Sequence, residues 1–123
     1  MLELNRIYNL KCEDGIPQLA DNSIDLVVTS PPYNVGWGGY IDNRPYEEYI
    51  NWLEGIFSLL YPKLCPGGRR CVNIGQGKNG RLPTTAHITQ RLEKIGYLPF
   101  AKVIWDKQQT SRRTAFKKLE ILT

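Results

Sequence analysis

The stretch VVTSPPYN at 27–34 places side chains and carbonyls capable of chemistry around two prolines. Ser30 offers a hydroxyl, Pro31 a carbonyl with no N–H of its own, and Tyr33 a flat aromatic ring. Two consecutive prolines cannot continue a central strand, because neither donates to the ladder, but they fix the backbone around them. Such a turn can receive a planar group that carries an amine. On these four residues alone, a rigid turn without chemistry remains an equal alternative.

The chemistry that suits this turn is activation of an amine. Two acceptors, the Ser30 hydroxyl and the Pro31 carbonyl, would hold the two hydrogens of an NH2 group while its ring stacks on Tyr33. Held in this way, the nitrogen moves toward tetrahedral geometry, and its lone pair becomes available as a nucleophile. An exocyclic amine of a nucleobase fits this description, and such a base must first leave the duplex stack.

The apolar pattern predicts the elements that must position the turn. Apolar residues at helical spacing indicate helices, and short β-branched runs indicate strands. In chain order we expect a buried strand at 24–29, a loop at 34–45, a helix at about 46–61 and a strand at 69–74. A glycine-rich turn at 75–80, a helix at about 85–95 and a strand at 101–105 follow. We expect Thr84 or Thr85 to cap the second helix and Gly96 to end it. This alternation predicts an α/β fold with a largely parallel sheet and crossover helices. The proline turn then lies at the carboxyl end of a strand, where such sheets bind ligands.

Composition sets wide limits on function. The chain has 123 residues, enough for one domain, and a net charge of +4, which suits a polyanionic partner. Residues 107–118 contain five basic side chains and no acid, although a solvated loop is the plainer interpretation of such a run. No segment is apolar enough to span a membrane or to act as a secretory signal, so we expect a soluble, cytoplasmic protein.

Metal and thiol chemistry are not indicated. The three cysteines lack C-x-x-C spacing and are expected to be free thiols, and His87 is the single histidine, so we predict no metal site. We expect His87 to lie on a helix surface or partly buried, without chemistry. The turn 75–80 lacks the G-x-x-x-x-G-K-[ST] pattern of a phosphate-binding loop.

SPPY after an apolar strand resembles the catalytic motif of S-adenosylmethionine-dependent DNA amino-methyltransferases, which methylate cytosine N4 or adenine N6. A serine at the first motif position is commoner among the cytosine-N4 enzymes, which favours cytosine. The similarity runs to about residue 116, and it is carried by 19–34, Tyr49 and Trp52 in the expected helix, PGGR at 66–69, VIWDK at 103–107 and RRTA at 112–115.

The resemblance implies a partial Rossmann-like methyltransferase sheet in a single domain. It also implies that Ser30 and the carbonyl of Pro31 bind the target amine, that Pro32 shapes the turn, and that Tyr33 stacks on the flipped base. No covalent enzyme intermediate is needed, because the base nitrogen is itself the nucleophile. Trp37 and Tyr40, in the loop after the motif, would either line the base pocket or pack in the core.

The resemblance further implies a cofactor and a partner. S-adenosylmethionine would lie near Ser30, Pro31 and the stretch around Lys11 and Cys12. The partner would be DNA, and Arg112 and Arg113 would contact its phosphates.

The chain departs from the family pattern in three ways. It contains no F-x-G-x-G loop for the methionine end of the cofactor. Lys11 stands where relatives often carry an acid that holds the adenine of the cofactor. After residue 116 the similarity stops, and 117–123 form an atypical tail.

These departures suggest a truncated or frame-shifted gene, or one half of a split enzyme. We therefore expect no methyl transfer by this chain alone, and either self-association or pairing with a complementary downstream chain. Two other functions stay open: a non-catalytic remnant or subunit that binds DNA or a partner, and methylation of another planar amine or amide.

Overall fold

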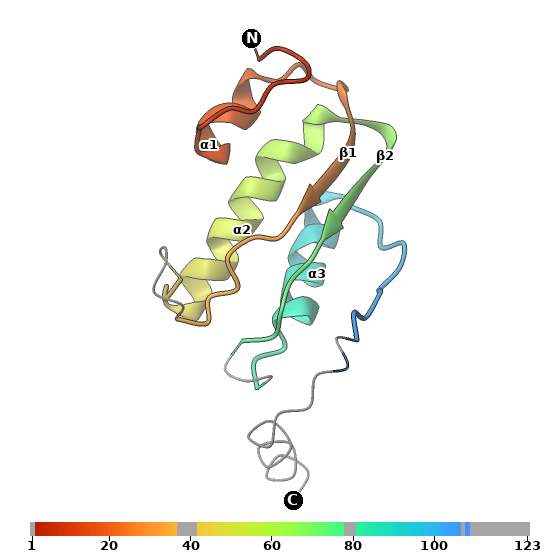
Figure 1. Cartoon of the computed structure of the whole chain (residues 1–123). Coiled ribbons are helices and arrows are strands. Elements are labelled where there is room, and N and C mark those ends of the chain that lie inside the picture. The colour runs from red at the N-terminus through yellow and green to blue at the C-terminus, as the bar shows by residue number, and fades with distance from the viewer. Residues whose placement is uncertain (1, 37–41, 78–80, 107, 109–123) are drawn as a thin grey trace, which may run out of the picture.

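Two parallel strands and two helices on one of their faces make up most of the fold (Figure 1). Strand β1 (Ile24–Thr29) pairs with β2 (Leu64–Val72), helix α2 (Tyr46–Leu60) connects them, and α3 (Thr84–Ile95) follows. A short helix α1 (Cys12–Gly15) and two 3₁₀ turns complete the described elements. Parallel strands joined through a helix confirm the expected α/β class with a partial Rossmann-like sheet.

The structure, a computed structural model, describes residues 2–36, 42–77, 81–106 and 108. Four residues named above lie outside these ranges: Trp37, Tyr40, Arg112 and Arg113. None of the described helices is both long and apolar enough to cross a membrane.

Helix α2 begins and ends close to its predicted bounds of 46–61. Pro45 precedes its first residue, and Glu47 and Glu48 in the first turn complement the positive end of the helix dipole. Its apolar stripe forms the core together with two residues of α3, and the buried members are Tyr49, Ile50, Leu53, Phe57, Leu60, Ile88 and Leu92. The stripe is buried because it faces the sheet and α3 at once.

Helix α3 ends as predicted but begins differently. Gly96 terminates it with a φ of 128°, and a Cβ there would lie 2.8 Å from the Tyr61 hydroxyl oxygen. The predicted threonine cap is wrong, because Pro83 occupies the N-cap position, and the Thr85 N–H in the first turn donates to Oε1 of Gln76 at 3.0 Å. The Thr84 hydroxyl instead accepts a hydrogen bond from the Gly77 N–H at 3.1 Å, which ties the helix start to the preceding turn.

The second strand is longer than the predicted 69–74 and begins at Leu64. Its pairing with β1 is interrupted, since Ile24 pairs with Leu64 and Leu26 pairs with Arg69. Residues 65–68 of β2 lie in that interruption, and Gly68 fits there because a Cβ at this position would lie only 2.8 Å from the Cys65 carbonyl oxygen. The strand therefore starts with a bulge that only a residue without a side chain fits well.

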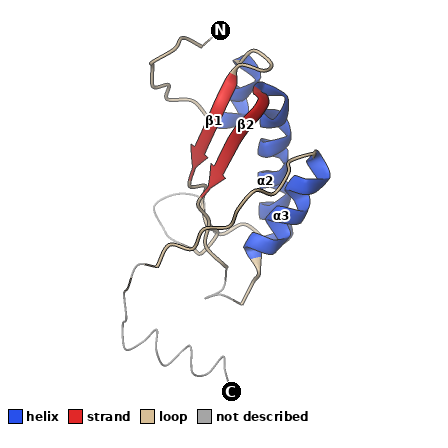
Figure 2. Ribbon diagram, turned by 90° about the vertical axis from the view of Figure 1, so that its right-hand side faces the viewer, coloured by secondary structure: helices blue, strands red, loops and turns tan. Residues whose placement is uncertain are grey.

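The two faces of the sheet have different surroundings. Val27 and Val72 pack against the helix core, whereas Leu26 and Val28 point the other way and keep 56 % and 73 % of their surface exposed. Figure 2 shows α2 and α3 on the same side of the strands. The expectation of a buried strand at 24–29 is thus wrong, because three of its six residues are partly buried, three are exposed and none is fully buried.

The expected third strand at 101–105 is absent from the described residues. Val103, Ile104 and Trp105 are 89 %, 80 % and 70 % exposed, and no ladder includes them. Their apolar, β-branched pattern was typical of a strand, but a strand requires a neighbouring strand to bond to.

Candidate functional site

The proline turn lies at the carboxyl edge of the sheet, as predicted. Ser30 directly follows the last residue of β1, and Asn73 directly follows the last residue of β2. The N–H of Asn73 donates to the carbonyl of Thr29 at 2.9 Å, so the strand pairing continues up to the turn. The register of two parallel strands therefore places residues 30 and 73 side by side.

The two proline carbonyls of the turn have different environments. The phenol of Tyr49, only 1 % exposed, donates to the Pro32 carbonyl at 2.5 Å and fixes the turn to α2. In the part of the chain that the structure describes, no group donates to the Pro31 carbonyl. The turn is thus anchored by one carbonyl, while the neighbouring carbonyl can accept a hydrogen bond from a bound ligand.

One carboxamide contacts both polar side chains of the motif. Nδ2 of Asn73 lies 3.0 Å from the hydroxyl of Tyr33 and 3.3 Å from the hydroxyl of Ser30. Gly75 lies beside the ring of Tyr33, since a Cβ built there would be 3.5 Å from Cδ2. Sequence reasoning missed Asn73, although its place directly after a strand adjacent to β1 was a usable signal.

A buried carboxylate closes the base of the loop that follows the motif. Asp42, 2 % exposed, accepts hydrogen bonds from the N–H groups of Asn34 at 2.7 Å and Val35 at 3.1 Å. The side chain of Asn34, whose φ is 58°, bonds to both the N–H and the carbonyl of Arg44. These contacts fix where the chain leaves the motif, and only asparagine's tolerance of positive φ hinted at them.

The predicted cofactor residues Lys11 and Cys12 lie at the start of α1 and are exposed. The thiol of Cys12 donates to Glu13 at 3.3 Å, and burial is the main cause that raises the pKa of this thiol. The indole N–H of Trp52 donates to Glu13 at 2.8 Å and lowers the pKa of that carboxyl. Within the described residues no hydrogen bond or ion pair joins this group to residues 30–33.

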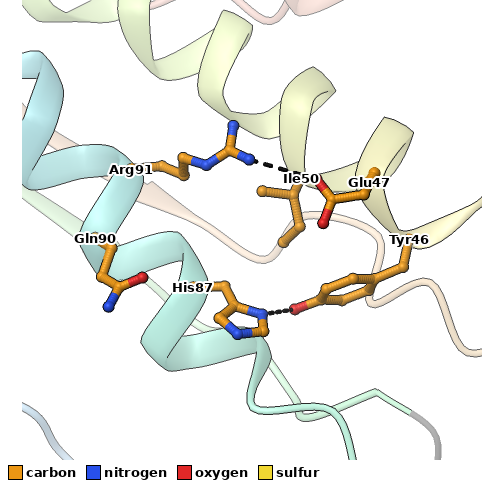
Figure 3. A pocket seen from close by; sticks show the side chains of 6 residues that line it. All are labelled: Tyr46, Glu47, Ile50, His87, Gln90 and Arg91. Atoms are coloured by element: carbon orange, nitrogen blue, oxygen red, sulfur yellow. Dashed lines mark hydrogen bonds and ion pairs between the residues drawn. The ribbon is translucent and has the colours of Figure 1, made fainter.

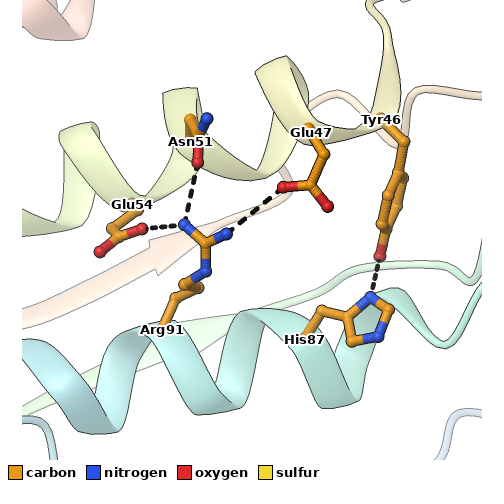
Figure 4. Close-up of polar contacts among 6 residues, drawn as sticks. All are labelled: Tyr46, Glu47, Asn51, Glu54, His87 and Arg91. Carbon is orange, nitrogen blue, oxygen red and sulfur yellow. Dashed lines mark hydrogen bonds and ion pairs between the residues drawn. The ribbon is translucent and has the colours of Figure 1, made fainter.

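A small pocket of about 130 Å³ lies between α2 and α3 (Figure 3). Four of its polar residues are paired: the Tyr46 hydroxyl lies 2.6 Å from Nδ1 of His87, and Arg91 contacts Glu47 as well as Glu54 of the same helix (Figure 4). His87 is half-buried, in keeping with the sequence expectation, and we assign this pocket a structural role. The described residues contain no group of three or more His, Cys, Asp or Glu that could hold a metal ion.

The parallel strands with their connecting helix and the proline turn at the carboxyl edge define an α/β domain with a candidate ligand site at that edge. A family model described as DNA methylase, of the N6 and N4 class, matches residues 24–120. The chain belongs to this family of DNA amino-methyltransferases, which confirms the resemblance carried by the SPPY motif.

The relatives include type II methyltransferases. M.MjaVI of Methanocaldococcus jannaschii is 41 % identical over 80 % of this chain and 53 % of its own length. M.BglII of Bacillus subtilis is 34 % identical over 83 % of this chain and 29 % of its own length. The chain thus spans about half, or less, of the curated relatives it matches.

A solved structure supports the fold. A candidate DNA modification methylase from Thermus thermophilus, crystallised with S-adenosyl-L-methionine, aligns with a TM-score of 0.52 and 27 % identity. The alignment covers 76 % of this chain and 48 % of that protein. The described sheet and helices therefore correspond to part of a methyltransferase domain.

Proposed function

We propose that the protein transfers a methyl group to an exocyclic amine of a base in DNA, cytosine N4, and that this chain supplies the acceptor site. The observation that carries the proposal is the geometry of the turn at the carboxyl edge. Tyr49 fixes the Pro32 carbonyl, which leaves the Pro31 carbonyl and the exposed Ser30 hydroxyl for the amine. Family membership supplies the reaction class, and the serine at the first motif position supports cytosine.

In this proposal the chain acts by positioning and polarising the amine. Ser30 and the Pro31 carbonyl accept its two hydrogens, and Tyr33 stacks on the ring of a base that has left the duplex. Hydrogen bonds to both hydrogens localise the nitrogen lone pair, so the base itself is the nucleophile. The free thiols Cys12, Cys65 and Cys71 then take no part in bond formation.

S-adenosylmethionine is the proposed methyl donor, because the Thermus protein was crystallised with it. When bound, it would supply an electrophilic methyl group. Ser30 and Pro31 stay its proposed neighbours, but Lys11 does not fit the role of an acid that holds its adenosine. Lys11 and Cys12 are exposed, and a lysine cannot accept hydrogen bonds from an adenosine as an acid would. We therefore propose that the site of the cofactor is formed mainly outside the described residues.

Binding of DNA is proposed to use positive charge. The chain carries a net charge of +4, and Arg112 and Arg113 are proposed to contact phosphates, which would make binding weaken with added salt. Acting on cellular DNA, the protein would work in the cytoplasm.

The uncovered face of the sheet favours a second proposal, that another segment covers it. Leu26 and Val28 are apolar, adjacent on one face and largely exposed. The covering segment would be a complementary downstream chain or a second copy, and this chain would then be one subunit whose own activity requires the partner. Sedimentation of the chain as a stable monomer at micromolar concentration would argue against a second copy.

A product analysis tests the proposed reaction. The chain, alone and mixed with a downstream methyltransferase segment, is incubated with labelled S-adenosylmethionine and unmethylated DNA, and the nucleosides are separated by mass spectrometry. We expect N4-methylcytosine from the mixture, and a loss of about a hundredfold or more for Ser30→Ala but not for Ser58→Ala, an exposed serine of α2. N6-methyladenine would overturn the choice of cytosine, and no labelled base under either condition would overturn the reaction.

A further inference from the structure

Asn73 links the two side chains that the proposed reaction uses at opposite ends of the SPPY turn. Its Nδ2 lies within hydrogen-bond distance of both the Ser30 and the Tyr33 hydroxyls, 3.3 and 3.0 Å away. Its backbone N–H is bonded to Thr29, so the amide projects from a fixed point at the end of the strand pair. No other described side chain contacts both hydroxyls.

We propose that Asn73 is a positioning residue of the acceptor site, which holds the Ser30 hydroxyl and the Tyr33 ring in the geometry that the base amine requires. This inference rests on the proposed function, because it assigns Asn73 a role in that same site. Asn73 acts through Ser30 and Tyr33 and need not touch the base.

The amide of Asn73 suits this position because it can restrain the Tyr33 ring through the hydroxyl. A tyrosine that stacks on a base must keep its ring plane fixed, and a hydrogen bond at its distal oxygen restrains that plane without occupying the ring face. The Tyr33 ring also lies beside Gly75, where a Cβ would be 3.5 Å from Cδ2.

The same amide controls the Ser30 hydroxyl. A serine oxygen has two lone pairs, so it can accept from Asn73 and still accept one hydrogen of a base amine. The bond to Asn73 selects the side-chain rotamer in which the oxygen faces the carboxyl edge of the sheet. Because Ser30 is exposed, this bond restrains a hydroxyl that would otherwise exchange among rotamers.

The test compares two replacements of nearly equal size. Asn73→Leu removes all hydrogen bonding, whereas Asn73→Asp keeps the shape and can accept the hydroxyl hydrogens of Ser30 and Tyr33. In the methyl-transfer assay we expect Asn73→Leu to lower kcat about 10- to 100-fold, with a smaller change in KM. We expect Asn73→Asp to retain kcat within about threefold and to raise KM in a salt-dependent way, because it adds a negative charge near DNA.

A double-mutant cycle separates positioning from a general structural role. Tyr33→Phe keeps the stacking ring but removes the hydroxyl, so Asn73→Leu should cost clearly less in that background than in the wild type. Asn51→Ala, which removes an exposed hydrogen-bonded asparagine of α2, is the matched control and should leave kcat unchanged. Additive effects, or an equal loss of kcat in Asn73→Asp and Asn73→Leu, would overturn the proposal.

A second readout needs no enzymatic activity. In nuclear magnetic resonance spectra of the chain, Tyr33→Phe should shift the side-chain amide signals of Asn73 and leave those of Asn51 in place. Unchanged Asn73 signals would overturn the link. If these signals shift but no form of the protein methylates DNA, the proposed function fails while the Asn73 contact stands, so the two failures are distinguishable.

Discussion

The two faces of the β1–β2 sheet carry similar side chains in different surroundings. Val27 packs against buried residues of α2 and α3, whereas Val28, next to it in the same strand, is 73 % exposed on the opposite face. Strands that are apolar on both faces are typical of parallel sheets covered on both faces. Strand β1 therefore has the composition for two covering layers, of which the described residues supply one.

The largest expected effect concerns the covered side. Leu53→Ala would empty space next to the core of α2 and is expected to lower the free energy of unfolding by about 2–5 kcal/mol. Leu59→Ala, on the same helix but 40 % exposed, should cost well under about 1 kcal/mol. Urea unfolding of both variants checks this, and equal midpoints would contradict the assignment of the covered side.

The next largest loss of stability is expected at the bulge in β2, which sets the register between β1 and β2. Gly68→Ala would place a Cβ 2.8 Å from the Cys65 carbonyl oxygen and 3.1 Å from that of Ile24, so backbone must move. We expect a loss of about 1–3 kcal/mol in thermal or urea unfolding. Gly55→Ala in α2, where a Cβ meets nothing within 4 Å, is the control and should stabilise by about 0.5–1 kcal/mol. A loss from Gly55→Ala as large as that from Gly68→Ala would show that the close approach is not the cause.

The most direct comparison uses the adjacent valines. Val27→Ala should destabilise the chain by about 1 kcal/mol, and Val28→Ala by much less, because only Val27 loses packing. Unfolding measurements on both variants decide the difference. Repeating them with a complementary downstream segment sharpens the comparison: an increased cost of Val28→Ala would locate the second covering layer on the open face.

The smallest expected change is a pH-dependent loss of stability at Tyr97, which lies at the edge of the covered face. Burial raises the pKa of Tyr97 to about 12, and its phenol donates to the Phe57 carbonyl at 2.8 Å. Since the folded pKa lies above the ordinary value of 10, this contribution to stability is full below pH 10 and is lost as the pH rises from 10 to 12. With the phenol half-exposed, we expect less than about 1 kcal/mol.

A pair of variants isolates that contribution. The loss of stability between pH 9 and 11.5 should be smaller in Tyr97→Phe than in the wild type, while the exposed Tyr8→Phe variant should follow the wild type. Identical pH profiles for all three proteins would contradict a raised pKa of Tyr97.

The helices and β1 were predictable because their signals are local. The stripe that includes Tyr49 and Leu53 needs only helical spacing to be recognised, and Gly96 needs only its conformational freedom to end α3. The strand predicted at 101–105 was wrong, because apolar residues indicate a strand but do not show whether a neighbouring strand is present to pair with it. The predicted start of β2 was wrong for a related reason, since the strand begins where Leu64 pairs with Ile24, and this contact is not visible in the residues of β2 alone.

The residues of the site also differ in whether their role can be predicted from local sequence. The SPPY turn was identified from its own residues, because the prolines and the position after a strand are visible in the sequence. Asn73 and Asp42 are single polar residues whose importance comes from hydrogen bonds to distant segments, and composition does not reveal these. Family resemblance supplied the reaction class, but it did not supply these two contacts.

The parallel pairing of β1 with β2 has a consequence for biosynthesis. A parallel partner cannot form by a tight turn, so β1 must wait until α2 and β2 have been synthesised, roughly 40 residues later. At about 5–20 residues per second, that wait lasts several seconds. During this interval the backbone groups of β1 lack their partner strand, and both of its valines lack the packing that the finished fold gives to Val27.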